Sequence, residues 1–434
     1  METVDLLVHS AAQLCVIPGP GPQRGAQLGT LGLIEDGAVA VRDGVIVDVG
    51  TTLALRPLYR AKQVLDAGGA CVLPGFVDPH THLPWAGERA GEFEMRLQGA
   101  SYMEIMAAGG GIMSTVQATR AATLQDLVRE NKSRLQTMLA HGTTSAECKT
   151  GYGLQKDAEL KQLEAMRLLN EAQPVELSYT FLPAHAVPAE YKGRTGDYVE
   201  AVIEEMLPAG AAWMEAQGVT LFCDVFCEEG VFDVLQTRRI LERAKELGYR
   251  LKVHADEFAG LGGTALAVSL GAVSADHLVQ TPPEDIQALG QAETVAVGLP
   301  GTPFGLGHTD YTPANEILEA GGALALATDL NPGTCWCESM QFVMALACRY
   351  MGLTQAQALA AATLNAAHAI GRGHEVGSLE IGKQADLLIL SEGDYRMLGY
   401  RFGVNLVQTV IKRGRIVAGA AVVSFSEEGF SSVA

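Results

Sequence analysis

The chain has 434 residues, of which 48% are hydrophobic and 19% are charged, and its formal net charge at pH 7 is −19. This composition is typical of a globular protein with enough apolar residues for a large core. An acidic surface repels phosphate backbones and anionic membranes, so the charge argues against nucleic acid and membranes as partners.

The start of the chain and its cysteines bear on the cellular compartment. The first ten residues, METVDLLVHS, contain no basic segment followed by an apolar core, and the chain contains no run of about 18 apolar residues. The eight cysteines are scattered, and none has the paired CxxC spacing of a zinc site. We therefore expect no secretory signal, no membrane span, reduced thiols and a cytoplasmic protein.

The two ends of the chain share a β-rich pattern. Residues 1–70 contain short apolar or alternating runs, such as VDLLVHSAAQLCVI and GAVAVRDGVIVDVG, which are broken by glycine and aspartate. The same pattern returns near the C-terminus in GSLEIGKQADLLILS, NLVQTVIKRGRIVAG and AAVVSF. Neither segment is long enough for a domain of its own, so we predict that residues 1–70 and 376–434 together form one small β-sandwich.

Residues 71–375 show a different pattern, in which short apolar runs alternate with segments of helical periodicity. This periodicity is clear in AELKQLEAMRLLNEA and VLQTRRILERAKELG, and the alanine-rich QALAAATLNAAHAI predicts one further helix. Eight strand–helix units predict an α/β fold of the TIM (β/α)8 barrel type, with a doubly wound parallel sheet as the alternative. The predicted strands span residues 71–78, 143–149, 178–185, 221–228, 250–256, 272–278, 294–300 and 323–330.

Polar side chains follow several of these strands, at the end where barrel enzymes carry their active sites. His80 and His82 follow the first strand, His254 lies in the fifth, His277 in the sixth and Asp329 in the eighth. Three imidazoles and a carboxylate suit a divalent or trivalent first-row metal that keeps room for a water. We predict that His80, His82, His254 and Asp329 are the metal ligands.

A cation in this place would lower the pKa of a water from about 16 toward 7 and so supply a hydroxide nucleophile. Glu257 and His277 are then free for proton transfer and for polarising a carbonyl, and Asp329 orients the nucleophile. The alternatives are that His277 is a fifth ligand or a core histidine, and that Glu257 forms an exposed salt bridge. The fourth strand lacks a lysine that could bridge two metals, and Lys149 follows the second, so we predict one ion.

Several motifs carry a resemblance to known proteins. PGFVDPHTH, HADEF, TDLNPG and GSLEIGKQADLLIL resemble the amidohydrolase superfamily over nearly the whole chain. Within it, GERAGEFEMRLQGASYMEI, GGGI, ECKTGYGL, FLPAHAVP and DLNPGTCW resemble the imidazolonepropionase family. The resemblance implies a TIM barrel with a flanking β-sandwich, cytosolic residence and one zinc or iron ion per subunit. It also implies hydrolysis of 4-imidazolone-5-propanoate to N-formimidoyl-L-glutamate in histidine degradation; barrels of this kind often dimerise, so we expect a homodimer.

The resemblance also assigns contacts with this small-molecule substrate. The propionate tail is anionic, and Arg89 offers it a forked bidentate partner. A surface ion pair with Glu88 or Glu92 is the alternative for Arg89, and core packing is the alternative for Tyr152. The family commonly has serine where this chain has Thr334, which keeps the hydroxyl. The substrate-binding residues implied are Arg89, Tyr152, His185, Glu257, Asn331, Gly333 and Thr334.

Two other functions fit parts of this pattern. A deaminase of a purine- or pyrimidine-like ring would use the same hydroxide, because attack on a ring C–NH2 carbon needs the same nucleophile. A barrel that serves as a non-catalytic scaffold is the second alternative, but such proteins tend to lose metal ligands and all four candidates are present here. Release of ammonia from a nucleobase would favour the deaminase. A protein that contains no metal would favour the scaffold.

Overall fold

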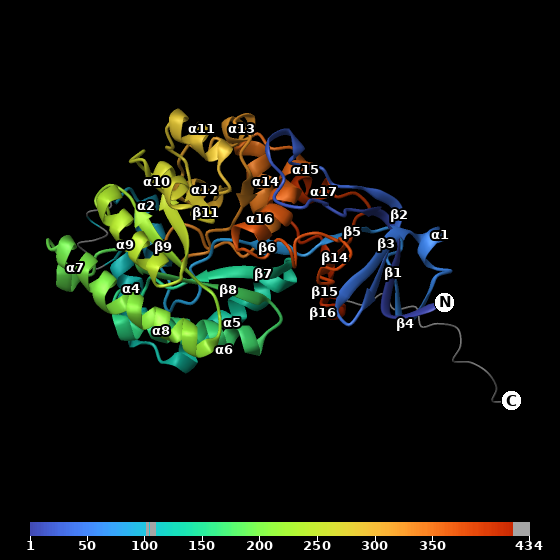
Figure 1. Ribbon diagram of the computed structural model, residues 1–434, viewed down its shortest axis with the longest axis horizontal. Coiled ribbons are helices and arrows are strands. Elements are labelled where there is room, and N and C mark those ends of the chain that lie inside the picture. Colours follow the sequence, from blue (N-terminus) through green and yellow to red (C-terminus); the bar gives the residue numbers. More distant parts are fainter. Residues whose placement is uncertain (101–103, 105–109, 420–434) are drawn as a thin grey trace.

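The computed structural model describes residues 1–100, 104 and 110–419, and these residues form two eight-stranded sheets with helices packed around one of them (Figure 1). The β-rich run AAVVSF at 420–425 and parts of the SYMEI and GGGI motifs lie outside the described residues. Within the part of the chain that the structure describes, we find no helix with the length and apolar character needed to cross a membrane.

The first sheet is the predicted barrel. Its strands are parallel and pair in chain order, which is the order of a TIM barrel and not that of a doubly wound sheet. A bridge between Thr81 and Leu330 joins the first strand's end to that of the last. The strands are β6 (Phe76–Asp78), β7 (Thr143–Lys149), β8 (Glu176–Ala184), β9 (Leu221–Cys227), β10 (Arg250–Ala255), β11 (Ser274–His277), β12 (Val295–Gly298) and β13 (Leu324–Leu326).

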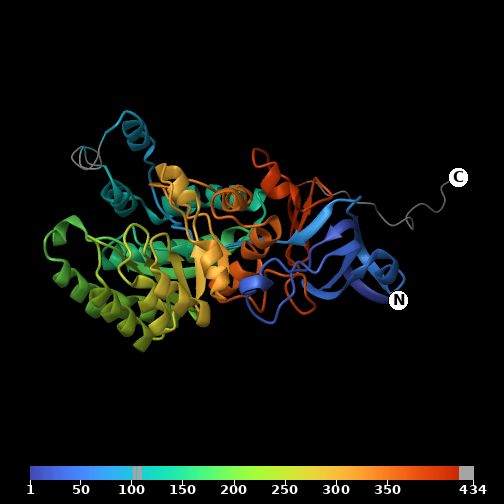
Figure 2. The same cartoon turned by 90° about the horizontal axis from the view of Figure 1, so that it is seen from above.

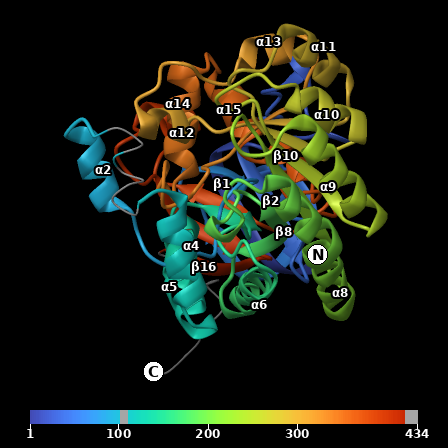
Figure 3. The same ribbon diagram turned by 90° about the vertical axis from the view of Figure 1, so that its left-hand side faces the viewer.

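Helices surround this barrel, as Figure 3 shows in a view from one end. The two segments of clear periodicity form α6 (Lys156–Ala172) and α9 (Val234–Glu246), and α9 begins with a capping box at Asp233. Among the described residues, the other helices of eight or more residues are α2 (Ala90–Leu97), α4 (Ile112–Ala121), α5 (Leu124–Ala140), α8 (Leu207–Gln217), α10 (Gly263–Leu270), α11 (Pro283–Gln291) and α14 (Met340–Tyr350). Shorter ones include α7 (Thr195–Ala201), α12 (Gly301–Leu306), α13 (Ala314–Glu319) and α17 (Met397–Tyr400).

The sequence predicts one helix over the alanine-rich stretch, but the structure divides it into α15 (Gln355–Ala361) and α16 (Leu364–Ala369). The break lies at Thr363, whose φ of −131° and ψ of −91° are not helical. Its hydroxyl donates to the carbonyl of Leu359 at 2.6 Å, so the side chain competes with the helical backbone pattern at this point.

The second sheet joins the two ends of the chain, as predicted, and it lies beside the barrel at one end of the molecule (Figure 2). It is one mixed sheet with its own apolar core, to which Leu6, Val39 and Leu387 contribute. Its strands are β1 (Glu2–Leu14), β2 (Ile34–Arg42), β3 (Val45–Thr51), β4 (Tyr59–Asp66), β5 (Cys71–Pro74), β14 (Leu387–Leu390), β15 (Val407–Lys412) and β16 (Arg415–Gly419).

The predicted strand at residues 71–78 is two strands in different sheets. β5 pairs with β1 and β14 of the terminal sheet, whereas β6 pairs with β7 of the barrel. Gly75 separates them, and it packs so closely on Thr144 that a Cβ atom would not fit. An apolar run cannot reveal such a change of sheet, because both halves are fully buried. The predicted domain limits at residues 70/71 and 375/376 stay a prediction.

An ionic cluster joins the barrel to the terminal sheet. Glu176, the first residue of β8, lies 2.6 Å from an arginine nitrogen of both Arg372 and Arg413 and 3.1 Å from Lys412 Nζ in β15. Burial alone would raise the pKa of Glu176, but the charges of Lys412 and Arg372 lower this pKa to about 2. The carboxylate therefore stabilises the folded state fully above its unfolded pKa, and this contribution is lost as the pH falls towards 2.

Replacing Glu176 by glutamine is expected to lower the free energy of unfolding by about 2 kcal/mol at pH 7, because the cations lose their shared partner. Chemical denaturation of both proteins should show this difference narrowing below about pH 4.5, where the unfolded carboxylate becomes protonated. Glu164→Gln, which removes a more exposed pair with Arg167, is the control and should cost less than about 1 kcal/mol. A Glu176 effect that does not change between pH 7 and 3 would contradict this account.

Candidate metal centre and active site

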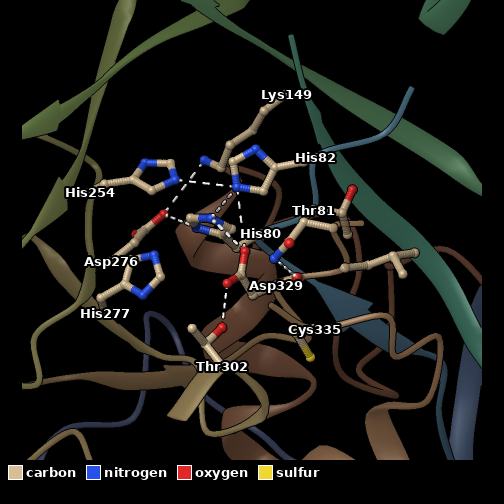
Figure 4. Close-up of polar contacts among 12 residues, drawn as sticks. His80, Thr81, His82, Lys149, His254, Asp276, His277, Thr302, Asp329 and Cys335 are labelled. Carbon is tan, nitrogen blue, oxygen red and sulfur yellow. Dashed lines mark hydrogen bonds and ion pairs between the residues drawn. The ribbon is translucent and has the colours of Figure 1, made fainter. Parts of the chain in front are cut away.

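The four predicted ligands meet at the carboxyl end of the barrel (Figure 4). His82 Nε2 lies 3.3 Å from His80 Nε2 and 3.4 Å from His254 Nε2. Asp329 Oδ1 lies 3.5 Å from His80 Nε2 and 3.4 Å from His82 Nε2. All four side chains are buried. The Nε2 atom of His82 thus lies 3.3 to 3.4 Å from a donor atom of each of the other three predicted ligands.

The donor set fits a single first-row cation. Neighbouring donors about 2.1 Å from a five-coordinate ion, which keeps one position for water, lie about 3.0 to 3.6 Å from one another, and the four separations given above fall in this range. Asp329 Oδ2 accepts a hydrogen bond from Thr302, whereas no described residue donates one to Asp329 Oδ1, although that atom is buried. A buried carboxylate oxygen without a donor is expected where a cation binds.

The backbone around the ligands explains why they point inward. Thr81, between the two histidines, donates its hydroxyl to the carbonyl of Glu147 at 2.6 Å, so alternate residues face the barrel interior. Asp329 has a φ of +54°, an uncommon value for a residue with a side chain. Its backbone N–H donates to the carbonyl of His80 at 3.1 Å, which connects the last ligand to the first.

Two carboxylates that the sequence analysis did not identify support the ligand histidines. Asp276 Oδ2 lies 2.7 Å from His80 Nδ1, and Asp224 Oδ2 lies 2.9 Å from His254 Nδ1. Such outer carboxylates fix the tautomer and ring orientation of a ligand histidine. Burial lowers the pKa of His80 well below its ordinary value, so the imidazole is neutral, as a metal ligand must be.

Glu257 and His277 lie beside the ligand cluster. Glu257 Oε2 is 3.6 Å from His277 Nε2, and the His277 ring centroid is 5.3 Å from that of His254. Glu257 is only 9% exposed, so it does not form an exposed salt bridge. Burial, followed by the charges of Asp329 and Glu228, raises the pKa of Glu257 well above its ordinary value. Burial lowers the pKa of His277 to about 3.

A cavity of about 430 Å³ opens next to this pair. Its lining includes Glu257, His277 and Thr302, together with Phe258 and His308. This volume lies in the range of small-molecule sites.

Tyr152 and His185 approach the ligands from the other side. The His185 ring stacks on that of His82, with centroids 4.7 Å apart and an interplanar angle of 14°. The Tyr152 ring centroid is 5.3 Å from that of His185 and 5.9 Å from that of His82. Gly151 has a φ of +109°, and a side chain there would press on His185. Burial raises the pKa of Tyr152, so its hydroxyl stays protonated.

Arg89 forms the ion pair with Glu92 that the sequence analysis gives as the alternative to substrate binding. It also faces the loop of Asn331, Gly333 and Thr334, whose residues are predicted to bind substrate. Its guanidinium lies 2.8 Å from Glu92 Oε2, and the arginine side chain is 17% exposed. One of its terminal nitrogens lies against Gly333, where an added Cβ atom would meet it and displace the guanidinium. Glu92 also accepts a hydrogen bond from the backbone of Gly111 at 3.0 Å.

Asn331 organises the loop that follows β13. Its side-chain oxygen accepts from the backbone N–H groups of Gly333 and Thr334, each at 2.8 Å. Its side-chain nitrogen donates to the carbonyl of Asp329 at 2.7 Å and to the Thr334 hydroxyl at 2.9 Å. Thr334 therefore keeps its hydroxyl in the loop, but the partner of that hydroxyl is Asn331.

Comparisons with known proteins agree with this geometry. The model of the amidohydrolase family matches residues 71–417, which include all eight barrel strands. Imidazolonepropionase from Herpetosiphon aurantiacus is 54% identical, with 96% of this chain and 98% of that protein covered. Imidazolonepropionase from Chloroflexus aggregans is 52% identical, with 96% and 99% covered.

Solved structures of lower identity share the fold. A zinc-bound adenosine deaminase from Xanthomonas campestris has a TM-score of 0.69 at 21% identity, with 96% of this chain and 93% of that chain covered. A 5-methylcytosine deaminase from Klebsiella pneumoniae has a TM-score of 0.71 at 18% identity, with 97% and 99% covered. The chain thus belongs to the amidohydrolase family and, within it, to the imidazolonepropionases.

Proposed function

We propose that this protein hydrolyses 4-imidazolone-5-propanoate to N-formimidoyl-L-glutamate, a step of histidine degradation. The observation that carries the proposal is the convergence of His80, His82, His254 and Asp329 beside Glu257, in a chain 54% identical to a curated imidazolonepropionase. The substrate is a five-membered cyclic amide with a propionate tail. Water adds to the ring carbonyl carbon, the bond from that carbon to the ring nitrogen breaks, and the nitrogen takes a proton.

His80, His82, His254 and Asp329 would hold one zinc or iron ion per chain, since nitrogen and oxygen donors accept either metal. When bound, such an ion lowers the pKa of a water and polarises a carbonyl oxygen. Burial lowers the pKa of His80 and of His82, and Asp329 Oδ1 has no donor among the described residues; both observations support this assignment.

Two other groups of close donors occur among the described residues, and both contain His80. His80, His254 and His277 share two side chains with the proposed ligands, so they do not form a separate site. His80, Glu147 and Asp276 form the other group. However, the ammonium nitrogens of Lys149 and Lys252 lie 2.9 and 2.7 Å from Glu147 Oε2. Because these two ammonium groups already supply positive charge there, a further cation would be repelled.

In this proposal Glu257 accepts a proton from the attacking water and passes it to the departing ring nitrogen. Its raised pKa suits that exchange, because a base with a pKa closer to neutrality can both take and return a proton. His277, 3.6 Å from Glu257, donates a hydrogen bond to the carbonyl oxygen as negative charge develops there. Asp329 orients the water, and Tyr152 and His185 contact the ring.

Arg89 would bind the propionate tail next to Gly333 and the loop that Asn331 and Thr334 form. Replacing Arg89 by alanine is expected to raise KM by about 10- to 100-fold with a smaller change in kcat, because the tail binds similarly in the ground and transition states. Steady-state kinetics on freshly prepared substrate measure both constants.

The matched control is Glu92→Gln, which removes the ion pair and keeps the guanidinium. KM should then change by less than about fivefold if Arg89 acts on the substrate. An unchanged KM in Arg89→Ala, or an equal rise in Glu92→Gln, would assign Arg89 to the ion pair alone.

Product analysis tests the proposed function directly. We expect freshly prepared imidazolone propionate to yield N-formimidoylglutamate, while adenine, guanine and cytosine derivatives release no ammonia. The deaminase alternative predicts the reverse result, and a non-catalytic barrel predicts turnover of neither. The homodimer, the cytoplasmic location and the lack of a nucleic acid partner stay predictions.

A further inference from the structure

A layer of charged side chains lies inside the barrel beneath the proposed ligands. It comprises Glu147 and Lys149 from β7, Asp224 from β9, Lys252 from β10 and Asp276 from β11, and each is 0% exposed. Taking charges out of water is costly, and a buried ion pair often contributes less stability than apolar residues of the same volume. Five such groups in one layer therefore call for a function beyond holding the barrel together.

Lys149 connects the three carboxylates of this layer. Its ammonium nitrogen lies 2.8 Å from Asp224 Oδ2, 2.9 Å from Glu147 Oε2 and 3.6 Å from Asp276 Oδ2. Although burial alone would lower it, the carboxylates of Asp224, Glu147 and Asp276 raise the pKa of Lys149 above its ordinary value. Lys252 is placed differently, because it reaches Asp276 only at 3.9 Å and donates to the carbonyl of Pro79.

The two aspartates extend these contacts to the ligand histidines. The Oδ2 atom of Asp224 that faces Lys149 also lies 2.9 Å from His254 Nδ1. The corresponding Oδ2 atom of Asp276 lies 2.7 Å from His80 Nδ1. Lys149 is thus connected to His254 through Asp224 and to His80 through Asp276. Figure 4 shows Lys149 beside both histidines.

The charges of this layer match the proposed cation. Two ammonium groups, of Lys149 and Lys252, face three carboxylates in the layer, which leaves one negative charge in excess. Asp329 above the layer adds a second. A divalent ion among the ligands would balance these two charges, which lowers the cost of burying them.

We infer that Lys149 is a positioning residue for the metal centre, an inference that rests on the proposed function. It holds the Oδ2 atoms of Asp224 and Asp276 in place. Asp276 Oδ2 shares a hydrogen bond with His80 Nδ1 and so keeps the proton of His80 on Nδ1. Asp224 Oδ2 is the ion-pair partner of His254 Nδ1, and both contacts turn an Nε2 lone pair toward the ion. Without the ammonium group, the two carboxylates would repel each other and rotate away from the histidines.

The test measures Zn²⁺ binding by competition with a chromophoric chelator, independently of turnover. Lys149→Met keeps the length of the side chain and removes its charge, and it should weaken Zn²⁺ affinity by about 10- to 100-fold. Lys412→Met is the matched control, because Lys412 is also a buried lysine between two carboxylates, Asp386 at 2.6 Å and Glu176 at 3.1 Å. It lies in the terminal sheet, so its Zn²⁺ affinity should stay within about twofold of the unmodified protein.

The outcomes separate this inference from the proposed metal centre. If the unmodified protein binds no Zn²⁺, the proposed centre fails. If it binds Zn²⁺ and folded Lys149→Met binds it equally well, or Lys412→Met loses as much affinity, the inference is overturned. Should Lys149→Met not fold, the charge-balanced variant Glu147→Gln/Lys149→Met is measured against the same limits. Failure of that variant to fold would assign Lys149 to the fold and overturn the inference as well.

Discussion

Replacing Glu257 by glutamine is expected to lower kcat by about 10³- to 10⁴-fold, since the amide has nearly the same shape but cannot carry a proton. Glu257 lies 3.6 Å from His277, is 9% exposed and borders the cavity next to the ligands. Steady-state kinetics together with elemental analysis measure the effect. The metal content should stay equal to that of the unmodified protein.

The matched control for this variant is Glu228→Gln. Glu228 is a buried neighbour whose carboxylate accepts a hydrogen bond from the backbone of Phe258 at 2.9 Å. We expect its kcat to stay within about tenfold of the unmodified value, because it supports the segment without reaching the substrate. Near-full kcat in Glu257→Gln would remove Glu257 from the chemistry.

Replacing Asp329 by asparagine is expected to weaken metal binding and to lower kcat/KM by at least about 10³-fold. Asparagine can still accept the hydrogen bond from Thr302. It removes the negative charge of the carboxylate, whose Oδ1 atom has no donor among the described residues. The variant would also leave the buried centre with one uncompensated positive charge when an ion binds. Chelator competition and steady-state kinetics measure the two effects separately.

Asp310→Asn is the control for Asp329, because Asp310 is an exposed carboxylate that lines the same cavity. It should retain metal affinity and most of its activity, since a solvated surface charge is replaced at little cost. An Asp329→Asn protein with unchanged metal affinity would show that this carboxylate is not a ligand.

The sequence predicts the barrel and the ligand positions because both leave strong local signals. Eight apolar runs separated by helical segments indicate parallel strands in chain order, and the structure has them in that order. Histidines and an aspartate at the ends of those runs are rare enough to stand out. Since strand ends of a barrel share one rim, His80 and Asp329 could be placed together without any knowledge of the contacts between them.

The charged layer beneath the ligands gives a much weaker signal. Asp224, Lys149 and Lys252 lie inside apolar strands, where a single charged residue can face the barrel interior, a neighbouring helix or the surface. Which of these applies depends on the register between strands, and the sequence does not contain that register. Sequence reasoning offers Lys149 only as a bridge between two metals, and its place at the end of the second strand rather than in the fourth argues against that role. The structure reveals its contacts with Asp224 and Asp276.

Arg89 illustrates a different limit of sequence reasoning. An arginine followed by Glu92 three residues later is compatible with a helical ion pair and with a substrate contact. The structure contains the ion pair and also places the guanidinium against Gly333. The two alternatives are therefore not exclusive, because an arginine has five donors and one carboxylate uses only some of them.

Reconstitution of metal-free protein tests the central claim most directly, that one cation held by His80, His82, His254 and Asp329 serves the hydrolysis. Turnover of freshly prepared imidazolone propionate should be abolished by prolonged chelation. It should then return in proportion to added Zn²⁺ or Fe²⁺ up to one equivalent per chain, with no further gain beyond that point. Full turnover by the metal-free protein, or a requirement for two equivalents, would contradict the account.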